Sequence, residues 1–467
     1  MIFLLCSLFS FWMQNMVVLL LPFLLPFTIY IAQDVRRAFW LMLFFIPFSM
    51  NLQERIGIGI DFPDEPFMLF LSWVCLLHLF YPHHRKGIWN WLKHPLVLVI
   101  LAILVWTLIT VLFSQDSLFS LKYFVKRLWY ILPFLVFGGY LFGEEGNERK
   151  AFMMLFIPLL FIILLVLYRF RELGFRFEEV HDPIQPFFQN HVMYGSMISS
   201  VVPLVFAAWW IQKPFHRNWI LLLAAIGIFL AGIYFSYSRA AWMAVLFAIV
   251  TMVAIRFKIM HYLLLCFYAI VLAGVLWLSH QNQYLNYRPR FEKTIMHESL
   301  TDHIMATLQG TDISSAERYY RWIAAVRMSQ DHPLVGVGPN NFYDYYKQYT
   351  ITSYRTWVSR NPERSTTHNY FLYMLVEQGY PGMIGYAFLL LALFWYGQRA
   401  WHQSRNKNER RMLMGVLGMM AAIFINNFFS ELLETDKIGS LFLLGLAFII
   451  RVDVKNRANQ KEAVSLR

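Results

Sequence analysis

Charged residues are scarce in this sequence of 467 residues. Asp, Glu, Lys and Arg together make up 15% of the chain, whereas soluble domains carry about 25%. Apolar residues reach 58%, and a globule of this length would need more charge to cover its surface. The shortage of charge argues against a soluble protein and indicates that much of the apolar surface faces lipid.

Signals for a disulfide framework or a metal site are also missing. The three cysteines, Cys6, Cys75 and Cys266, all lie in apolar runs and show no metal-ligand spacing. No Walker motif or zinc motif occurs, so we predict no cofactor and no bound metal. The first residues lack the basic stretch of a cleavable signal peptide, so we expect them to form a retained membrane segment.

Apolar segments recur along the whole chain with short polar breaks. A membrane-spanning helix needs about 20 apolar residues, and these segments predict about 12–14 crossings. The expected fold is an all-α, polytopic transmembrane helical bundle. The segments are 2–32, 37–50, 66–81, 95–113, 121–142, 151–168, 190–212, 218–236, 238–256, 260–279, 369–396, 411–430 and 436–451.

Lysine and arginine concentrate in alternate loops. Basic residues fill the loops 82–94, 213–218, 256–258 and 397–411 and the tail 452–467. Counting crossings places all of these on one side, which the positive-inside rule identifies as the cytoplasm. The same pattern accounts for much of the net charge of +12, which in a soluble protein would suggest nucleic-acid binding. We therefore predict no nucleic-acid partner.

One polar insertion, residues 280–367, is too long to be a loop without structure of its own. The crossing count places it outside the cytoplasm. The pattern Ser314-x-x-Glu317 is a capping box and predicts a helix that runs to about Gln330. The predicted division is therefore N-terminal transmembrane helices 1–279, a partly helical loop domain 280–367, C-terminal transmembrane helices 368–451 and a cytoplasmic tail 452–467.

Three arginines are candidate ligands for an anion at the outer face. Arg239 stands between two apolar segments, where it is either an anion ligand or a snorkelling interfacial side chain. Arg318 and Arg321 lie three residues apart on the predicted helix of the insertion. Their planar guanidinium groups suit phosphate oxygens, although a solvated charged helix face is the alternative.

A histidine stands where the insertion meets the next membrane segment. His368 titrates near neutral pH and is a candidate general base, the alternative being an ordinary helix-start residue beside Asn369. Glu377 follows nine residues later, so it orients His368 only if the helix is kinked between them. Lys126 and Arg127 add positive charge near one end of segment 121–142, together with Lys122; as a group they are more typical of lipid-headgroup anchors than of catalytic residues.

Three stretches, 315–325, 333–342 and 368–382, resemble the O-antigen ligase / O-antigen polymerase superfamily. In that family an arginine precedes a tryptophan by four residues, as Arg318 precedes Trp322 here. A Pro-x-x-Gly-x-Gly-x-x-x-Phe turn follows, and a His-Asn pair then precedes a Glu-x-Gly-x-x-Gly stretch. The Ser-x-Ser-Arg sequence that ends at Arg239 is similar to a further arginine motif upstream in the family.

The resemblance implies transfer of a glycan from an undecaprenyl-diphosphate carrier to an acceptor hydroxyl on the periplasmic face of the bacterial inner membrane. It implies an inverting, metal-independent glycosyltransferase whose partners are the carrier-linked donor, a lipid or saccharide acceptor and membrane lipids. Arg239, Arg318 and Arg321 would bind the diphosphate, and His368 would act as the base.

Two further choices stay open at the level of sequence. Gly382 is followed by Met383-Ile384-Gly385, not by the Gly-Thr-Asp pattern frequent in the ligase branch. A ligase with lipid A-core as acceptor and an O-antigen or exopolysaccharide polymerase therefore both fit. A lipid or polysaccharide transporter is the alternative of another class, but apart from Glu377 the apolar runs carry no charged residue well inside them.

Overall fold

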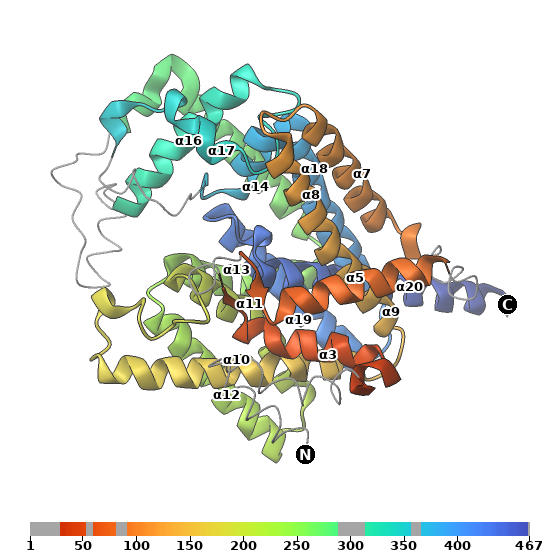
Figure 1. Cartoon of the computed structure of the whole chain (residues 1–467). Coiled ribbons are helices and arrows are strands. Elements are labelled where there is room, and N and C mark those ends of the chain that lie inside the picture. The colour runs from red at the N-terminus through yellow and green to blue at the C-terminus, as the bar shows by residue number, and fades with distance from the viewer. Residues whose placement is uncertain (1–28, 53–58, 81–90, 288–312, 356–365, 466–467) are drawn as a thin grey trace, which may run out of the picture.

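The computed structural model describes residues 29–52, 59–80, 91–287, 313–355 and 366–465 (Figure 1). In these ranges the chain is almost wholly helical, with one short antiparallel strand pair, β1 (Met50–Asn51) and β2 (Asp61–Phe62). Nine helices in the described ranges are long and apolar enough to cross a membrane. The prediction of an all-α, polytopic membrane fold is confirmed.

The candidate spans agree with the predicted apolar segments between residues 95 and 430. Segment 121–142 becomes α8 (Ser117–Tyr130), a π-helical stretch (Ile131–Phe137) and α9 (Gly138–Leu141). The other candidate spans are α7 (Pro95–Leu112), α10 (Asn147–Glu172), α11 (His191–Ile211), α12 (Arg217–Phe235), α13 (Arg239–Arg256), α14 (Met260–Ser279) continued by a 3-10 helix (His280–Tyr287), α18 (Tyr370–Gln403) and α19 (Lys407–Phe428).

Two predicted segments differ from what the structure shows, and a third, 66–81, agrees with it to within two residues. Segment 37–50 contains only the ten-residue α3 (Arg36–Phe45), which ends in a short 3-10 helix, Ile46–Phe48, that contains Pro47. Segment 66–81 becomes the 17-residue α5 (Asp64–Phe80). The last segment becomes the 30-residue α20 (Asp436–Ser465), which continues without a break into the predicted tail 452–467. Most of segment 2–32 lies outside the described residues.

The centre of the bundle is built from α11, α13 and α19. Small residues let these helices approach closely: a Cβ on Gly418 would lie 2.5 Å from Met252 and 2.9 Å from Pro203. Nearer the other end of α11, Gly195 packs against Ser238 at the start of α13. Asn426, near the end of α19, donates to Ser199 at 3.1 Å. The helix starts at residues 191 and 239 therefore lie at the same end of the bundle as the end of α19.

The insertion has a small core of its own. It contains α16 (Ile313–Asp331), which agrees with the predicted helix 314–330, and α17 (Phe342–Tyr345). Figure 1 shows α16 and α17 together at one edge of the molecule, near the ends of α7, α8 and α18. The residues of this core are Tyr320, Ala324, Ala325, Met328, Val337, Phe342, Tyr346, Tyr354 and, from α18, Val376. Val376 is a residue of the membrane helix α18 and packs in this core. The insertion therefore contacts the bundle directly.

A break in α18 receives the glycine-rich turn of the insertion. Gly379 has φ 72°, a left-handed conformation that glycine adopts without steric cost. Its neighbour Tyr380 donates its N–H to Pro333 O at 2.8 Å. Two further backbone bonds, Val337 N–H to Val376 O (2.9 Å) and Gly338 N–H to Glu377 O (3.1 Å), continue this pairing. Backbone carbonyl groups of α18 just before the break thus accept hydrogen bonds from the insertion.

We predict that Gly379→Ala destabilises the protein. The new methyl group would put an alanine in the left-handed region and would lie 1.9 Å from the carbonyl oxygen of Leu334. The free energy of unfolding should therefore fall by more than about 1 kcal/mol. Gly227→Ala is the matched control, because a Cβ there meets no atom within 4 Å. Thermal unfolding in detergent, followed by size-exclusion fluorescence, should show a lower Tm for the first variant alone. Equal Tm values would contradict the proposed docking.

Candidate functional site

His368 lies in a tightly held turn between the insertion and α18. Its φ of 52° is uncommon for a residue other than glycine and persists only when the surroundings fix it. Two side chains of α16 hold the preceding backbone: Arg321 donates to Thr366 O at 2.9 Å, and Trp322 donates to Thr367 O at 2.9 Å. The helix of the insertion therefore sets the position of the imidazole.

Asn369 fixes the other side of the same turn. Its Oδ1 accepts the N–H groups of Phe371 (3.0 Å) and Leu372 (3.1 Å), so it is the N-cap of α18. Its Nδ2 donates to Phe428 O at 2.9 Å and so ties the turn to the end of α19. The predicted supporting residue Asn369 thus joins two membrane helices directly behind His368.

The imidazole of His368 has a carboxylate nearby and is affected by the charges of two guanidinium groups. Its Nδ1 is 3.9 Å from Oε2 of Glu431, and 28% of its side chain is exposed. Burial, together with the positive charges of Arg318 and Arg321, lowers the pKa of His368 well below its ordinary value. Burial raises the pKa of Glu431. The imidazole is therefore neutral at neutral pH and able to accept a proton.

Arg318 and Arg321 occupy different levels of this site, although the sequence predicted a shared face. Arg318 is half-buried, and its Nε lies 3.4 Å from Phe429 O at the end of α19. The side chain of Arg321 is only 1% exposed and donates to Glu317 Oε1 at 2.8 Å. The two arginines therefore do not point together toward solvent. Arg321 is buried and donates to the backbone of the His368 turn, whereas Arg318 is more exposed.

Arg239 is the first residue of α13 and follows the N-cap Ser238. It is half-buried, and its helix starts at the end of the bundle where α19 ends, as the contacts of Gly195 and Gly418 show. The structure thus brings Arg318, Arg321 and His368 into one cluster and places Arg239 at the same end of the bundle. Its role as a phosphate ligand stays a prediction.

Glu377 serves the glycine-rich turn and makes no described contact with His368. Its Oε2 accepts the N–H of Asn340 at 2.7 Å, and its Oε1 accepts the N–H of Phe342 at 3.4 Å. The break in α18 comes after Glu377, at Gly379, so it does not turn this carboxylate back toward His368. Among the described residues, the carboxylate beside the imidazole is Glu431 instead.

Lys126 and Arg127 each lie 3.5 Å from a carboxylate of the protein, Glu65 and Glu434 respectively, and the side chain of Lys126 remains 39% exposed. Helix α8 begins at Ser117, so both residues lie well inside the candidate span Ser117–Leu141. Arg127 donates to the hydroxyl of Tyr370 at 2.6 Å and lies 3.5 Å from Oε1 of Glu434. The partner carboxylate of Arg127 lies more than 300 residues away in sequence and is not visible in the local pattern, and the interpretation of these residues as headgroup anchors stays a prediction.

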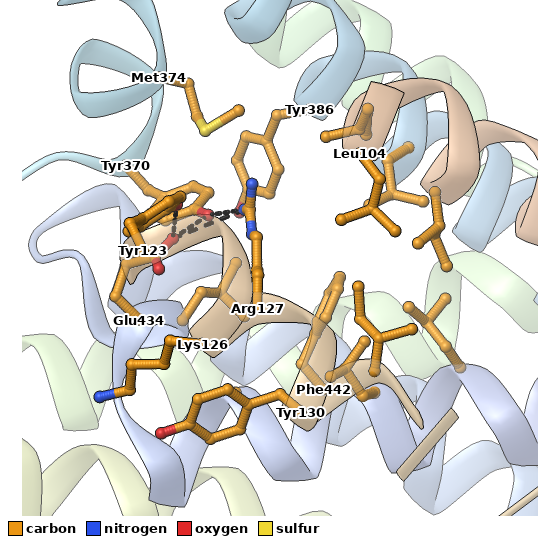
Figure 2. A pocket seen from close by; sticks show the side chains of 18 residues that line it. Leu104, Tyr123, Lys126, Arg127, Tyr130, Tyr370, Met374, Tyr386, Glu434 and Phe442 are labelled. Carbon is orange, nitrogen blue, oxygen red and sulfur yellow. Dashed lines mark hydrogen bonds and ion pairs between the residues drawn. The ribbon is translucent and has the colours of Figure 1, made fainter. Parts of the chain in front are cut away.

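These residues line a cavity, which we call the tyrosine pocket. It lies between α7, α8, α18 and α20, and its volume is about 90 Å³. Figure 2 shows Tyr123, Arg127, Tyr370 and Glu434 grouped on one side, with Leu104 across the pocket. The lining residues are Ile100, Ile103, Leu104, Tyr123, Lys126, Arg127, Tyr130, Ile131, Tyr370, Met374, Tyr386, Leu389, Leu433, Glu434, Gly439, Phe442, Leu443 and Leu446.

Two acidic residues of the site, Glu431 and Glu434, were not singled out from the sequence. Their spacing of three residues, directly before a membrane segment, is the one signal that could have drawn attention to them. In the parts of the chain that the structure describes, no group of three or more His, Cys, Asp or Glu side chains could hold a metal ion.

The fold and this cluster define a polytopic membrane protein with arginines and a histidine gathered at one end of its helical bundle. Residues 224–387 match the protein-family model described as O-Antigen ligase. The predicted resemblance is confirmed, and the chain carries a domain of the O-antigen ligase / O-antigen polymerase superfamily. This match supports a membrane glycosyltransferase of the O-antigen ligase or polymerase type, a class that acts in lipopolysaccharide biosynthesis. No curated protein matches the chain significantly.

We predict that Arg318→Gln raises the pKa of His368, because the substitution removes one of the positive charges that lower it. Diethyl pyrocarbonate modifies neutral imidazole, so its reaction with the peptide that contains His368, followed by mass spectrometry across pH, reports this pKa. The reactive range should begin at higher pH in the variant. Arg327→Gln on the same helix is the control, since Arg327 contacts Tyr284 and Tyr349 instead. A shift of the same size in both variants would refute the electrostatic explanation.

Proposed function

We propose that the protein transfers a glycan from an undecaprenyl-diphosphate carrier to an acceptor hydroxyl on the periplasmic face of the bacterial inner membrane. The O-antigen ligase reaction, with lipid A-core as acceptor, is the preferred form, and polymerisation within the same superfamily is the alternative. The observation that supports this best is the cluster in which Arg318 and Arg321 flank His368, with Glu431 at 3.9 Å.

The donor diphosphate carries the negative charge that such a site attracts. Arg318, at the surface of the cluster, would bind its oxygens, and Arg239 would approach them from α13 at the same end of the bundle. As the bond between the anomeric carbon and the diphosphate oxygen breaks, negative charge grows on the leaving group. Guanidinium groups already in place stabilise that charge without reorganising.

His368 would take the proton of the acceptor hydroxyl. Its neutral form has a free lone pair, and the bound diphosphate would offset the positive field of Arg318 and Arg321, which makes the imidazole more basic. Since Nδ1 faces Glu431, Nε2 remains for the substrate, and the carboxylate stabilises the imidazolium that forms. The acceptor oxygen then bonds to the anomeric carbon while polyprenyl diphosphate leaves, and a single in-line displacement inverts that carbon.

The placement of basic loops supports the periplasmic side. The cluster lies where the insertion meets the bundle, and the positive-inside rule puts the insertion opposite the basic loops such as 397–411. An undecaprenyl chain in the outer leaflet would then carry its diphosphate to the level of Arg318. The inner membrane is the location that fits a donor of this kind.

His368→Ala should reduce transfer by about 10²–10⁴-fold, the usual contribution of a general base. The assay uses the chain reconstituted in vesicles with carrier-linked glycan and lipid A-core, without an ion gradient, and detects the product by mass spectrometry. His280→Ala is the control, because that exposed histidine ends the span of α14, outside the cluster. Full activity of His368→Ala would remove the mechanism, and product that appears only under a gradient would favour a transporter.

Glu431→Gln tests the carboxylate beside the imidazole. The amide keeps the size of the side chain but cannot stabilise an imidazolium, so we expect kcat to fall at least about tenfold while the KM for the donor stays within about twofold. Steady-state kinetics in the same vesicles measure both constants. If kcat is unchanged, Glu431 has only a structural role in the turn.

A further inference from the structure

The pair formed by His368 and Glu431 does not hold itself together. The distance between His368 Nδ1 and Glu431 Oε2 is 3.9 Å, which is longer than a hydrogen bond. The two residues belong to separate chain segments, the turn before α18 and the segment between α19 and α20. Because the attraction between a carboxylate and an imidazolium falls with distance, the alignment of these two segments decides how well Glu431 can act.

A hydrogen bond beside this pair joins the same two segments. The hydroxyl of Tyr370 donates to Oε1 of Glu434 at 2.6 Å. Tyr370 follows His368 by two residues and is the first residue of α18. Glu434 follows Glu431 by three residues and donates its N–H to Glu431 O at 3.1 Å, so both glutamates belong to one turn. This bond therefore restrains the spacing of His368 and Glu431.

Helix α8 holds Glu434 from a third direction. Arg127 of this helix donates to the Tyr370 hydroxyl at 2.6 Å and lies 3.5 Å from Oε1 of Glu434. Tyr123, one turn earlier, donates to the same Oε1 at 2.8 Å. Figure 2 shows these four side chains, which we call the Glu434 network, converging on one wall of the pocket. Hydrogen bonds to an ionised partner are stronger than those between neutral groups, so the network holds the turn of Glu434 firmly.

The tyrosine pocket is too small to enclose a ligand. Its volume is about 90 Å³, whereas pockets that enclose a small molecule measure about 300–1,000 Å³. Its other walls are apolar, with Leu104 of α7 and Phe442 of α20 among them. The polar groups of Arg127 and Glu434 therefore bind one another, and their role lies in what they hold in place.

Helix α8 also contacts the insertion. Ser120, near the start of the helix, donates to Pro339 O at 2.7 Å. Directly before the helix, Gln115 donates its N–H to Val337 O at 3.0 Å. One end of α8 thus binds the glycine-rich turn, and Arg127 further along it belongs to the Glu434 network. The helix links the docked insertion, which carries the arginines of the cluster, to the carboxylate side of the site.

We propose that Tyr370 and Glu434, held by Arg127, are positioning residues for the base. They keep Glu431 beside His368, so that the imidazolium formed during transfer is stabilised. This role rests on the proposed function, because it acts through the proton acceptor assigned there. The network contacts neither the donor nor the acceptor, and so it sets kcat and not substrate affinity.

The first experiment removes the hydroxyl of Tyr370 and keeps its ring. Tyr370→Phe in the vesicle assay should lower kcat at least about fivefold, while the KM for the donor stays within about twofold. Tyr268→Phe is the matched control, because it removes another half-buried hydroxyl, which donates to Ala387 O at 3.0 Å outside the network. Its kcat should stay within about twofold of that of the unaltered chain. Equal kcat values for the two variants would overturn the proposal.

A double-mutant cycle with Glu431 separates positioning from general stability. If Tyr370 acts through Glu431, its hydroxyl has nothing left to position once Glu431→Gln is in place. Adding Tyr370→Phe to Glu431→Gln should therefore lower kcat by less than about twofold. Tyr123→Phe, which removes the other phenol from Glu434 Oε1, should show the same dependence on Glu431. A purely structural role would give the same fold loss with and without Glu431→Gln and would contradict the proposal.

The activity of His368→Ala distinguishes a failure of this proposal from a failure of the proposed function. If His368→Ala abolishes transfer while Tyr370→Phe or Glu431→Gln leaves kcat unchanged, the network does not position the base and the proposed function stands. Full transfer by His368→Ala would instead remove the base that the network positions. Binding of the carrier-linked donor to Tyr370→Phe, measured by native mass spectrometry, should be unchanged. A loss of donor binding would assign the network to substrate binding and overturn the positioning role.

Discussion

The contact on which the site depends is the docking of the glycine-rich turn into the break of α18. Buried Glu377 accepts the N–H groups of Asn340 and Phe342, and the backbone of residues 376–377 pairs with residues 337–338. This contact fixes the insertion on the bundle and so decides where α16 lies. Arg318 and Arg321 reach His368 only because α16 is held there.

Electrostatics then divides the end of the bundle into two environments. Around His368 the guanidinium groups disfavour the protonated imidazole. A bound anion would offset their charge, so the imidazole would become more basic when the anion is present. In the tyrosine pocket each cation faces a carboxylate at 3.5 Å. Charged side chains are costly within a membrane bundle, so the presence of these pairs in the candidate span Ser117–Leu141 is consistent with a functional use.

Much of the fold could be predicted because its signals are local. Apolar length marked the spans from α7 to α19, and a capping pattern marked α16 to within a residue or two. The motif around His368 placed this residue where the insertion meets the next membrane helix, and the structure has it in the turn directly before α18. The role expected for Glu377 could not be judged from spacing alone, since it depended on where α18 breaks, and that break is set by contact between Gly379 and Leu334.

The sequence by itself determined that this is a helical membrane protein with a structured insertion and a histidine next to arginines in a family motif, because hydropathy, capping and motif spacing are read along the chain. Only the tertiary structure decided which carboxylates serve the site. Tyr370 meets Arg127 across a sequence separation of 243 residues, and Tyr123 meets Glu434 across 311. Such partners are chosen by helix packing, which no local pattern encodes.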